Sequence, residues 1–450
     1  MMTHRYLAGL LLLWLWGCAT TRAPAREGLE FIEDDLETAL RVARETGRPV
    51  FVDAWAPWCQ SCRAMRSTVL TDPRVTAHGP RFVWLTVNTD APANADFLRR
   101  FPVDTWPTLL VLAPEGPDVL ARSLGALSAP QLVAFLQSAE RDLLARRAPP
   151  SAGKGASDAL RRADALALAK THAEAAAAYQ RVLDQLAPDD ARRAGVVVST
   201  LKSQLSTGAS EDCMRLVARE LPALARVEDR ARLLYVGLGC ALDLDTPEAL
   251  ELRARLLEAT RQALDEPADA LAPVLRSALY DAGCEVHQSA DDAAGLHALA
   301  ARWWRFLEED AREATSAEAR AALDAHRLMA SVHLEQPGRA IPFLQRSERE
   351  LPQDYAPAAR LATLYLMTGR LDEALQASQR ALARVRDAGR GMVLSGHARI
   401  LHARGERAQA EQLLTRALRE LEQAPDAPNT PQQRRLLTMT LEQLRPGSVR

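Results

Sequence analysis

Two cysteines separated by two residues follow an apolar segment, and this arrangement constrains the fold more than any other feature of the chain. Residues 49–55 have the length and apolar character of a buried strand, and a turn is expected at residues 56–58. Cys59 and Cys62 then begin a stretch that we expect to be helical. Free amides and the helix dipole stabilise a thiolate at such a position, and Arg63 adds a positive charge there. The spacing also lets the second sulfur attack a mixed disulfide at the first.

A pair of this kind can also belong to a zinc site, which usually needs four ligands and a second pair. The sequence contains no second Cys-x-x-Cys, and His78 is the only histidine in residues 29–147. We therefore expect neither a metal nor a cofactor. An inert structural disulfide remains an alternative to a redox-active one.

The rest of residues 29–147 alternates between helical and strand periods. Apolar residues from Leu36 to Ala43 recur at helical spacing, and Gly47 is placed to end that helix. Further strands are expected at residues 82–87, 108–112 and 119–124, and further helices at residues 94–101 and 128–146. This order predicts an α/β domain.

Three segments of this domain resemble the thioredoxin family. Residues 52–62 (Val-Asp-Ala-Trp-Ala-Pro-Trp-Cys-Gln-Ser-Cys) resemble its active-site signature, and residues 106–108 (Trp-Pro-Thr) resemble its cis-proline loop. Residues 71–75 are similar to the C-terminal periplasmic domain of bacterial thiol:disulfide interchange reductases. The resemblance covers roughly residues 31–137.

The resemblance implies a role for individual side chains. Cys59 would be the attacking thiol and Cys62 the resolving thiol, and Asp53 would be a buried acid that moves a proton to or from Cys62. A turn-capping role for Asp53 is the alternative. The expected substrate-docking residues are Pro107, in the cis form, with Trp106 and Trp58. An ordinary trans bond before Pro107 is the alternative, since cis is the minority isomer.

Two positions depart from thioredoxin itself. Gln60-Ser61 replaces Gly-Pro between the cysteines, so the reduction potential of thioredoxin does not transfer to this chain. Thr86 stands where thioredoxin has a lysine near its buried acid. We therefore expect the acid to be tuned differently here.

Residues 1–18 have the pattern of an export signal. A short charged end precedes the apolar residues 7–16, a stretch too short to cross a bilayer as a helix. The end of this stretch, Leu15-Trp16-Gly17-Cys18, resembles the bacterial lipoprotein box, in which the cysteine is lipidated. We expect a lipid on Cys18 and a location in the bacterial cell envelope, facing the periplasm, where disulfides persist. An ordinary secretory signal or a membrane-retained stub remains an alternative.

Residues 148–157 are rich in Pro, Gly and Ser, and we predict a linker there that few contacts cross. Residues 158–445 have helical patterns. The clearest unit, residues 355–386, has the spacing of a tetratricopeptide repeat, while residues 190–320 cannot be brought into register with it. Stacked helix pairs form a curved solenoid, which commonly binds proteins or peptides. A spacer is the alternative.

The remaining cysteines lie in this helical region. Cys213 and Cys240 fall on consecutive predicted helices, so a disulfide is possible in a hairpin, although buried thiols are the reading we favour. Cys284 is expected to be unpaired and buried. For the adjacent Trp303 and Trp304, burial of both rings and exposure of one to a partner are both open.

The sequence thus predicts an α/β thioredoxin-like domain followed by an all-α tetratricopeptide-like solenoid. The net charge of −2 does not indicate a nucleic-acid partner. The predicted function is an envelope thiol–disulfide oxidoreductase that reduces protein disulfides and binds partners through its helical repeats. The alternative is a lipid-anchored scaffold or assembly protein with little redox turnover.

Overall fold

The computed structural model describes residues 28–103, 105–147, 155–190, 192–267, 270–314, 316–386, 389–423 and 430–444. The predicted export signal with Cys18 lies outside these residues, as do residues 148–154 of the predicted linker. Within the described ranges, no helix is both long enough and apolar enough to cross a lipid bilayer.

The N-terminal domain, residues 28–147, is built on a five-stranded sheet with the order β1-β3-β2-β4-β5. The strands are β1 (Phe31–Glu33), β2 (Val50–Trp55), β3 (Val83–Asn88), β4 (Thr108–Leu112) and β5 (Val119–Leu124). β3 pairs in parallel with β1 and β2, whereas β4 is antiparallel to both β2 and β5. All the predicted strands are present, and β1 is an addition that the sequence pattern did not reveal.

Side chains alternate between the two faces of the sheet along each strand, and the apolar side chains on both faces are covered by helices. Phe51 and Val111 pack with α5 (Ala129–Arg147), and Val52 and Leu110 pack with α1 (Leu36–Thr46). α1 ends at Gly47, which has a φ of 66°, as its position in the sequence predicts. The shorter helices are α2 (Gln60–Ala64), η1 (Met65–Val69), α3 (Pro73–Thr76), η2 (Gly79–Arg81), η3 (Pro92–Asn94) and α4 (Ala95–Arg100).

The helical domain, residues 155–444, is a succession of helices that pack on their neighbours in the chain. Its first half consists of α6 (Gly155–Leu168), α7 (His172–Leu183), α8 (Arg193–Ser206), α9 (Ser210–Glu220), η4 (Leu221–Ala223), α10 (Val227–Leu242), α11 (Pro247–Asp265), α12 (Pro273–Ser289) and α13 (Ala293–Glu313). Its second half consists of α14 (Ala317–Ala321), α15 (Asp324–His333), η6 (Pro337–Ala340), α16 (Ile341–Glu350), α17 (Ala356–Met367), α18 (Leu371–Arg384), α19 (Gly389–Ala403), α20 (Arg407–Gln423) and α21 (Thr430–Leu444). One hydrophobic cluster extends from α6 to α19.

The predicted repeat at residues 355–386 is a helix pair, α17 and α18. Leu361, Ala374 and Ala381 are fully buried where small side chains allow close helix contact. Gly369 has a φ of 72° in the turn between the two helices, a conformation that glycine adopts readily. The repeat spacing therefore corresponds to a real packing unit.

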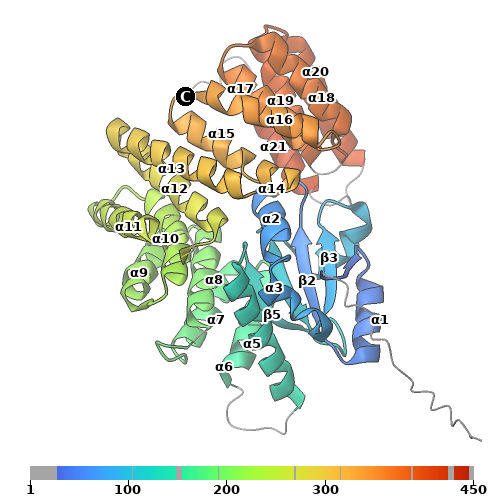
Figure 1. Cartoon of the computed structure of the whole chain (residues 1–450), viewed down its shortest axis with the longest axis vertical. Coiled ribbons are helices and arrows are strands. Elements are labelled where there is room, and N and C mark those ends of the chain that lie inside the picture. Colours follow the sequence, from blue (N-terminus) through green and yellow to red (C-terminus); the bar gives the residue numbers. More distant parts are fainter. Residues whose placement is uncertain are drawn as a thin grey trace, which may run out of the picture.

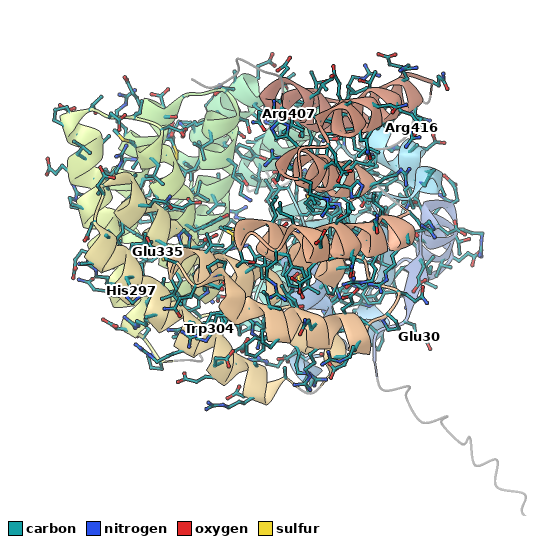
Figure 2. The ribbon with its side chains drawn as sticks, turned by 90° about the horizontal axis from the view of Figure 1, so that it is seen from above. Glu30, His297, Trp304, Glu335, Arg407 and Arg416 are labelled. Carbon is teal, nitrogen blue, oxygen red and sulfur yellow. A yellow bond between two sulfur atoms is a disulfide. The ribbon has the colours of Figure 1, made fainter. Side chains whose placement is uncertain are left out.

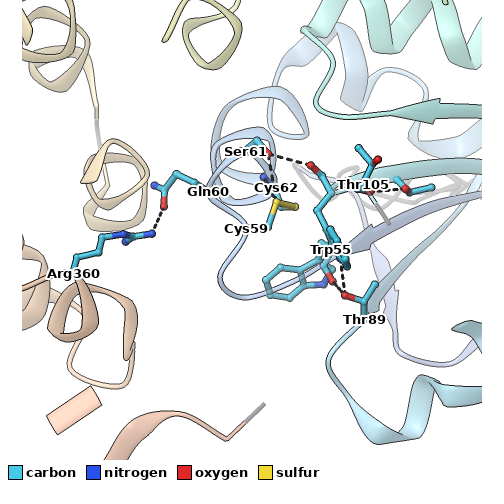
Figure 3. Close-up of a disulfide and its surroundings, with 10 residues drawn as sticks. Trp55, Cys59, Gln60, Ser61, Cys62, Thr89, Thr105 and Arg360 are labelled. Carbon is cyan, nitrogen blue, oxygen red and sulfur yellow. Dashed lines mark hydrogen bonds between the residues drawn. A yellow bond between two sulfur atoms is a disulfide. The ribbon is translucent and has the colours of Figure 1, made fainter. Parts of the chain in front are cut away.

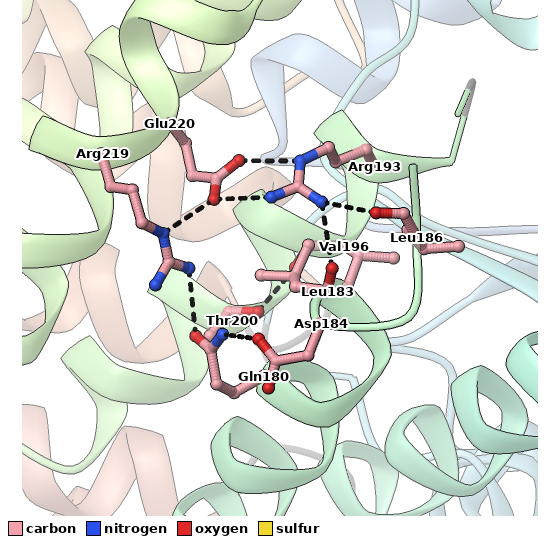
Figure 4. Close-up of polar contacts among 9 residues, drawn as sticks. All are labelled: Gln180, Leu183, Asp184, Leu186, Arg193, Val196, Thr200, Arg219 and Glu220. Atoms are coloured by element: carbon pink, nitrogen blue, oxygen red, sulfur yellow. Dashed lines mark hydrogen bonds and ion pairs between the residues drawn. The ribbon is translucent and has the colours of Figure 1, made fainter. Parts of the chain in front are cut away.

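Buried polar contacts also connect the helices, as Figure 4 shows near α8. Arg193 makes two hydrogen bonds, of 2.9 and 2.8 Å, to the buried carboxylate of Glu220 on α9. The same guanidinium donates to the carbonyl oxygens of Leu183 and Leu186 at 3.0 Å. One side chain thus binds two carbonyl oxygens at and just after the end of α7 and links that helix end to α9.

The prediction that few contacts cross between the two domains is wrong. The helical domain curves, so that α6 packs on β5 at one end while α14 packs on α2 and η1 farther along (Figure 1). Arg232 on α10 also donates to the carbonyl oxygen of Ala126 at 3.0 Å. Figure 2 shows from above that the helices follow one another in an arc. Arg407 and Arg416 of α20 are exposed on its surface. The end of the predicted linker is helical as well, because α6 begins at Gly155.

The structure decides between the alternatives left open for the other cysteines and for the two adjacent tryptophans. Cys213 and Cys240 form a disulfide between α9 and α10, with their Cα atoms 6.0 Å apart, so our preference for two thiols is wrong. The helices pack side by side, which brings the two sulfurs together. Cys284 is unpaired and buried, as predicted. Trp303 and Trp304 are both buried.

Candidate active site

Cys59 and Cys62 form a disulfide at the start of α2, with their Cα atoms 5.3 Å apart (Figure 3). Cys59 is the N-cap residue of α2, and its Sγ accepts a hydrogen bond of 3.1 Å from the amide of Cys62. A donated amide proton and the positive end of a helix both stabilise a thiolate at this sulfur once the disulfide is reduced. Only 4% of Cys59 and none of Cys62 is exposed, so Cys59 is the sulfur nearer the surface.

Tryptophan side chains surround the disulfide. The rings of Trp58 and Trp106 lie edge to face, with centroids 4.9 Å apart, and the Trp106 indole donates to the Thr89 hydroxyl at 2.8 Å. The Trp106–Pro107 peptide bond is cis, as the resemblance implied. Ser61 Oγ lies 3.4 Å from Cys59 Sγ and 3.4 Å from the Trp106 carbonyl oxygen, so the cis-proline loop lies directly beside the pair.

Asp53 is a buried acid on β2, with 1% of its surface exposed. Its register partners are Thr86 on β3 and Leu109 on β4. Burial raises the pKa of Asp53 from 3.8 to about 6, against the opposing charge of Arg66. Its Oδ2 has no hydrogen-bond partner among the residues that the structure describes. A carboxyl in this state changes protonation near neutral pH, which suits a group that exchanges protons.

Comparison with family models agrees with this geometry. The model described as a thioredoxin-like domain matches residues 36–140. Residues 36–140 are a thioredoxin-like domain. A second model, described as a tetratricopeptide repeat, matches residues 331–391, which include α16, α17 and α18.

Curated relatives of the chain are thiol:disulfide interchange proteins. DsbD 2 of Pseudomonas aeruginosa is 36% identical over 110 residues, which are 24% of this chain and 19% of that protein. DsbD of Ralstonia nicotianae is 34% identical over 119 residues, which are 26% of this chain and 19% of that protein. The chain therefore spans about a fifth of the length of these relatives.

Among solved structures, the APC/C hetero-tetramer Cut9–Hcn1 matches 70% of this chain and 80% of its own chain. The sequence identity is 11% and the TM-score is 0.23. The repeat assignment therefore rests on the family model and on the helix pairs themselves.

The structure adds site residues that sequence reasoning missed, because their partners lie in the helical domain. Gln60 donates through Nε2 to the carbonyl oxygen of Ala321 at 2.8 Å and accepts at Oε1 from Arg360 at 2.9 Å. Arg63 forms an ion pair with Asp354. The sequence signal was only the polar character of the positions beside the cysteines, which does not reveal a partner about 300 residues away.

The helical domain also forms a cavity next to the thioredoxin-like domain. Its volume is about 700 Å³, and it is lined by Trp58 together with residues that come mainly from α17 and α19. Met367 and Met392 line this cavity and are about half exposed. A largely apolar surface therefore begins at a tryptophan that packs in the wall of the disulfide site.

Proposed function

We propose that the chain is a thiol–disulfide oxidoreductase that reduces disulfides in protein clients and holds those clients on its helical domain. The observation that carries this proposal is the disulfide of Cys59 and Cys62 at the start of α2, beside cis-Pro107 in a thioredoxin-like domain. The names of the curated relatives point to the same chemistry.

In the reducing direction, the thiolate of Cys59 attacks a client disulfide. A mixed disulfide forms, and one client sulfur leaves as a thiolate and takes up a proton. Asp53 accepts the proton of Cys62, whose sulfur then attacks Cys59 and releases the second client thiol. Two electrons pass to the client and the Cys59–Cys62 disulfide is restored. A dithiol donor supplies two electrons and two protons for the next cycle.

The surrounding side chains position the client in this reaction. Cys59 is nearly covered, so a client sulfur approaches through the rim formed by Trp58, Trp106 and Pro107. The cavity that begins at Trp58 suits an extended apolar segment of the same client, since exposed methionines adapt to varied partners. Tetratricopeptide repeats support this binding role.

We place this reaction in the bacterial cell envelope, with the chain held by a lipid on Cys18 and facing the periplasm. The lipobox-like sequence supports this location. The buried disulfide of Cys213 and Cys240 supports it as well, because structural disulfides persist in oxidising compartments.

The client-binding part of the proposal is tested with Met367→Asp/Met392→Asp. We expect this variant to lose at least tenfold in kcat/KM toward an unfolded polypeptide with one disulfide. Its rate with oxidised glutathione should stay unchanged, because that substrate is too small to reach the cavity. Met439→Asp on α21 is the matched control, since Met439 is also about half exposed but does not line the cavity. Equal losses on both substrates would contradict the proposal.

A lipid-anchored scaffold with little turnover is the second candidate, and the burial of both sulfurs favours it. The two functions differ in the behaviour of Cys62→Ser. An oxidoreductase lacking its resolving thiol accumulates mixed disulfides with clients, and these vanish in Cys59→Ser/Cys62→Ser. A scaffold accumulates none in either variant.

A further inference from the structure

The helix that carries the cysteines is held from the side by the helical domain. Gln60 and Arg63 are three residues apart, so they lie on one face of α2, next to the face that carries the two sulfurs. Both have partners in or just before α17. Arg360 of α17 hydrogen-bonds to Gln60 (Figure 3), and Asp354, two residues before α17, pairs with Arg63. The helix pair α17–α18 therefore contacts the helix that carries the cysteines directly.

These contacts form a compact charge cluster at the domain boundary. Its members are Arg63 and Arg360 with Asp354 and Asp324. Asp324 is fully buried, and burial raises its pKa to about 6 against the charges of Arg360, Arg327 and Arg63. The side chains of Arg63 and Asp354 are 15% and 17% exposed, so solvent and salt screen their attraction less than that of a surface pair.

We propose that Asp354 is a positioning residue that neutralises Arg63 and thereby makes the Cys59–Cys62 couple more reducing. The inference rests on the proposed oxidoreductase function. A positive charge beside a cysteine stabilises its thiolate, and stabilising the reduced form makes a couple more oxidising. Arg63 directly follows Cys62 in the chain, and its amide donates to the carbonyl oxygen of Cys59 at 3.1 Å. The carboxylate of Asp354 opposes this charge from the helical domain.

The substitution Asp354→Asn separates the charge from the structural role of this side chain. Asp354 Oδ1 also accepts a hydrogen bond of 2.9 Å from the amide of Ala356 at the start of α17. Asparagine keeps an oxygen for that bond and is equally favoured at helix starts. The variant therefore removes the negative charge while the hydrogen bond to the amide of Ala356 is kept.

The full-length protein is equilibrated with glutathione, in the reaction of enzyme disulfide with two glutathione thiols to give enzyme dithiol and oxidised glutathione. We expect Asp354→Asn to shift the equilibrium constant about tenfold toward the dithiol, which corresponds to about 30 mV. Arg63→Gln should shift it in the opposite direction, because the cation itself is lost. The pKa of the Cys59 thiol, followed by alkylation rate against pH, should fall in the first variant and rise in the second.

Glu348→Gln is the matched control, since Glu348 pairs with Arg380 and Arg384 within the helical domain. It should leave the equilibrium unchanged. If Asp354→Asn and Arg63→Gln shift the equilibrium constant in the same direction, the contact is merely structural and the inference is overturned. An unchanged equilibrium constant in a folded Asp354→Asn protein would overturn it as well. If the wild-type disulfide does not exchange with glutathione at all, the proposed function itself fails.

Discussion

The substitution Asp53→Asn tests how the buried acid behaves in the folded chain. Asp53 lies on a central strand, and burial raises its pKa from 3.8 to about 6. Between these two pH values the folded chain binds more protons than the unfolded chain, so stability falls as pH rises through this window. Above pH 6 the ionised carboxylate destabilises the fold by about 3 kcal/mol, as an order of magnitude. Below pH 3.8 this cost is absent.

Asparagine has the shape of the neutral acid and never ionises, so it removes this cost. We therefore expect Asp53→Asn to stabilise the oxidised protein by about 3 kcal/mol more at pH 8 than at pH 3.5, relative to wild type. The assay is urea unfolding at both pH values, read by hydrogen exchange of peptides from β2 and β3. A local readout is needed because a chain with several domains does not unfold in one step.

Asp72→Asn is the control for this prediction. A hydrogen bond from Arg74 lowers the pKa of the Asp72 carboxyl, so its contribution has the opposite sign. The stability that Asp72 provides is present above its unfolded pKa and is lost as pH falls through the folded value. Asp72→Asn should therefore destabilise the domain more at pH 8 than at low pH. A pH-independent effect of Asp53→Asn would refute the reasoning about the buried acid.

Two further predictions concern the other cysteines. Labelled fatty acid should attach to the wild-type protein in bacteria and be absent from Cys18→Ala, and equal labelling of both proteins would contradict a lipid anchor. Cys240→Ser opens the disulfide to Cys213, which closes a loop with a sequence separation of 27, and should destabilise the helical domain by about 3.5 kcal/mol. Urea unfolding read by hydrogen exchange of peptides from α9 and α10 measures this loss, and an unchanged midpoint would show that the cross-link is dispensable.

Local sequence patterns were sufficient for the elements that carry the cysteine pair. The strand before Cys59 and the helix start at the pair follow from neighbouring residues, and the family resemblance implied the cis bond before Pro107; the structure has all three. The same holds for the repeat at residues 355–386, because its small residues and Gly369 indicate a pair of closely packed helices. The chemical roles of Asp53, Trp58 and Trp106 stay predictions.

The contacts between domains were beyond sequence reasoning. Whether Arg360 reaches Gln60 depends on the curvature of the solenoid, which accumulates a small rotation at each helix pair. The sequence of a single repeat does not determine this total rotation. Periodicity likewise places Cys213 and Cys240 on neighbouring helices but does not give the distance between them.

The reduction of insulin by the purified protein, with dithiothreitol as the electron donor, tests the central claim most directly. Wild-type protein should reduce insulin much faster than dithiothreitol alone, and Cys59→Ser should fall to that background rate, because the sulfur that starts the exchange is gone. Equal rates for wild type and Cys59→Ser would contradict the claim that Cys59 and Cys62 are a redox-active pair.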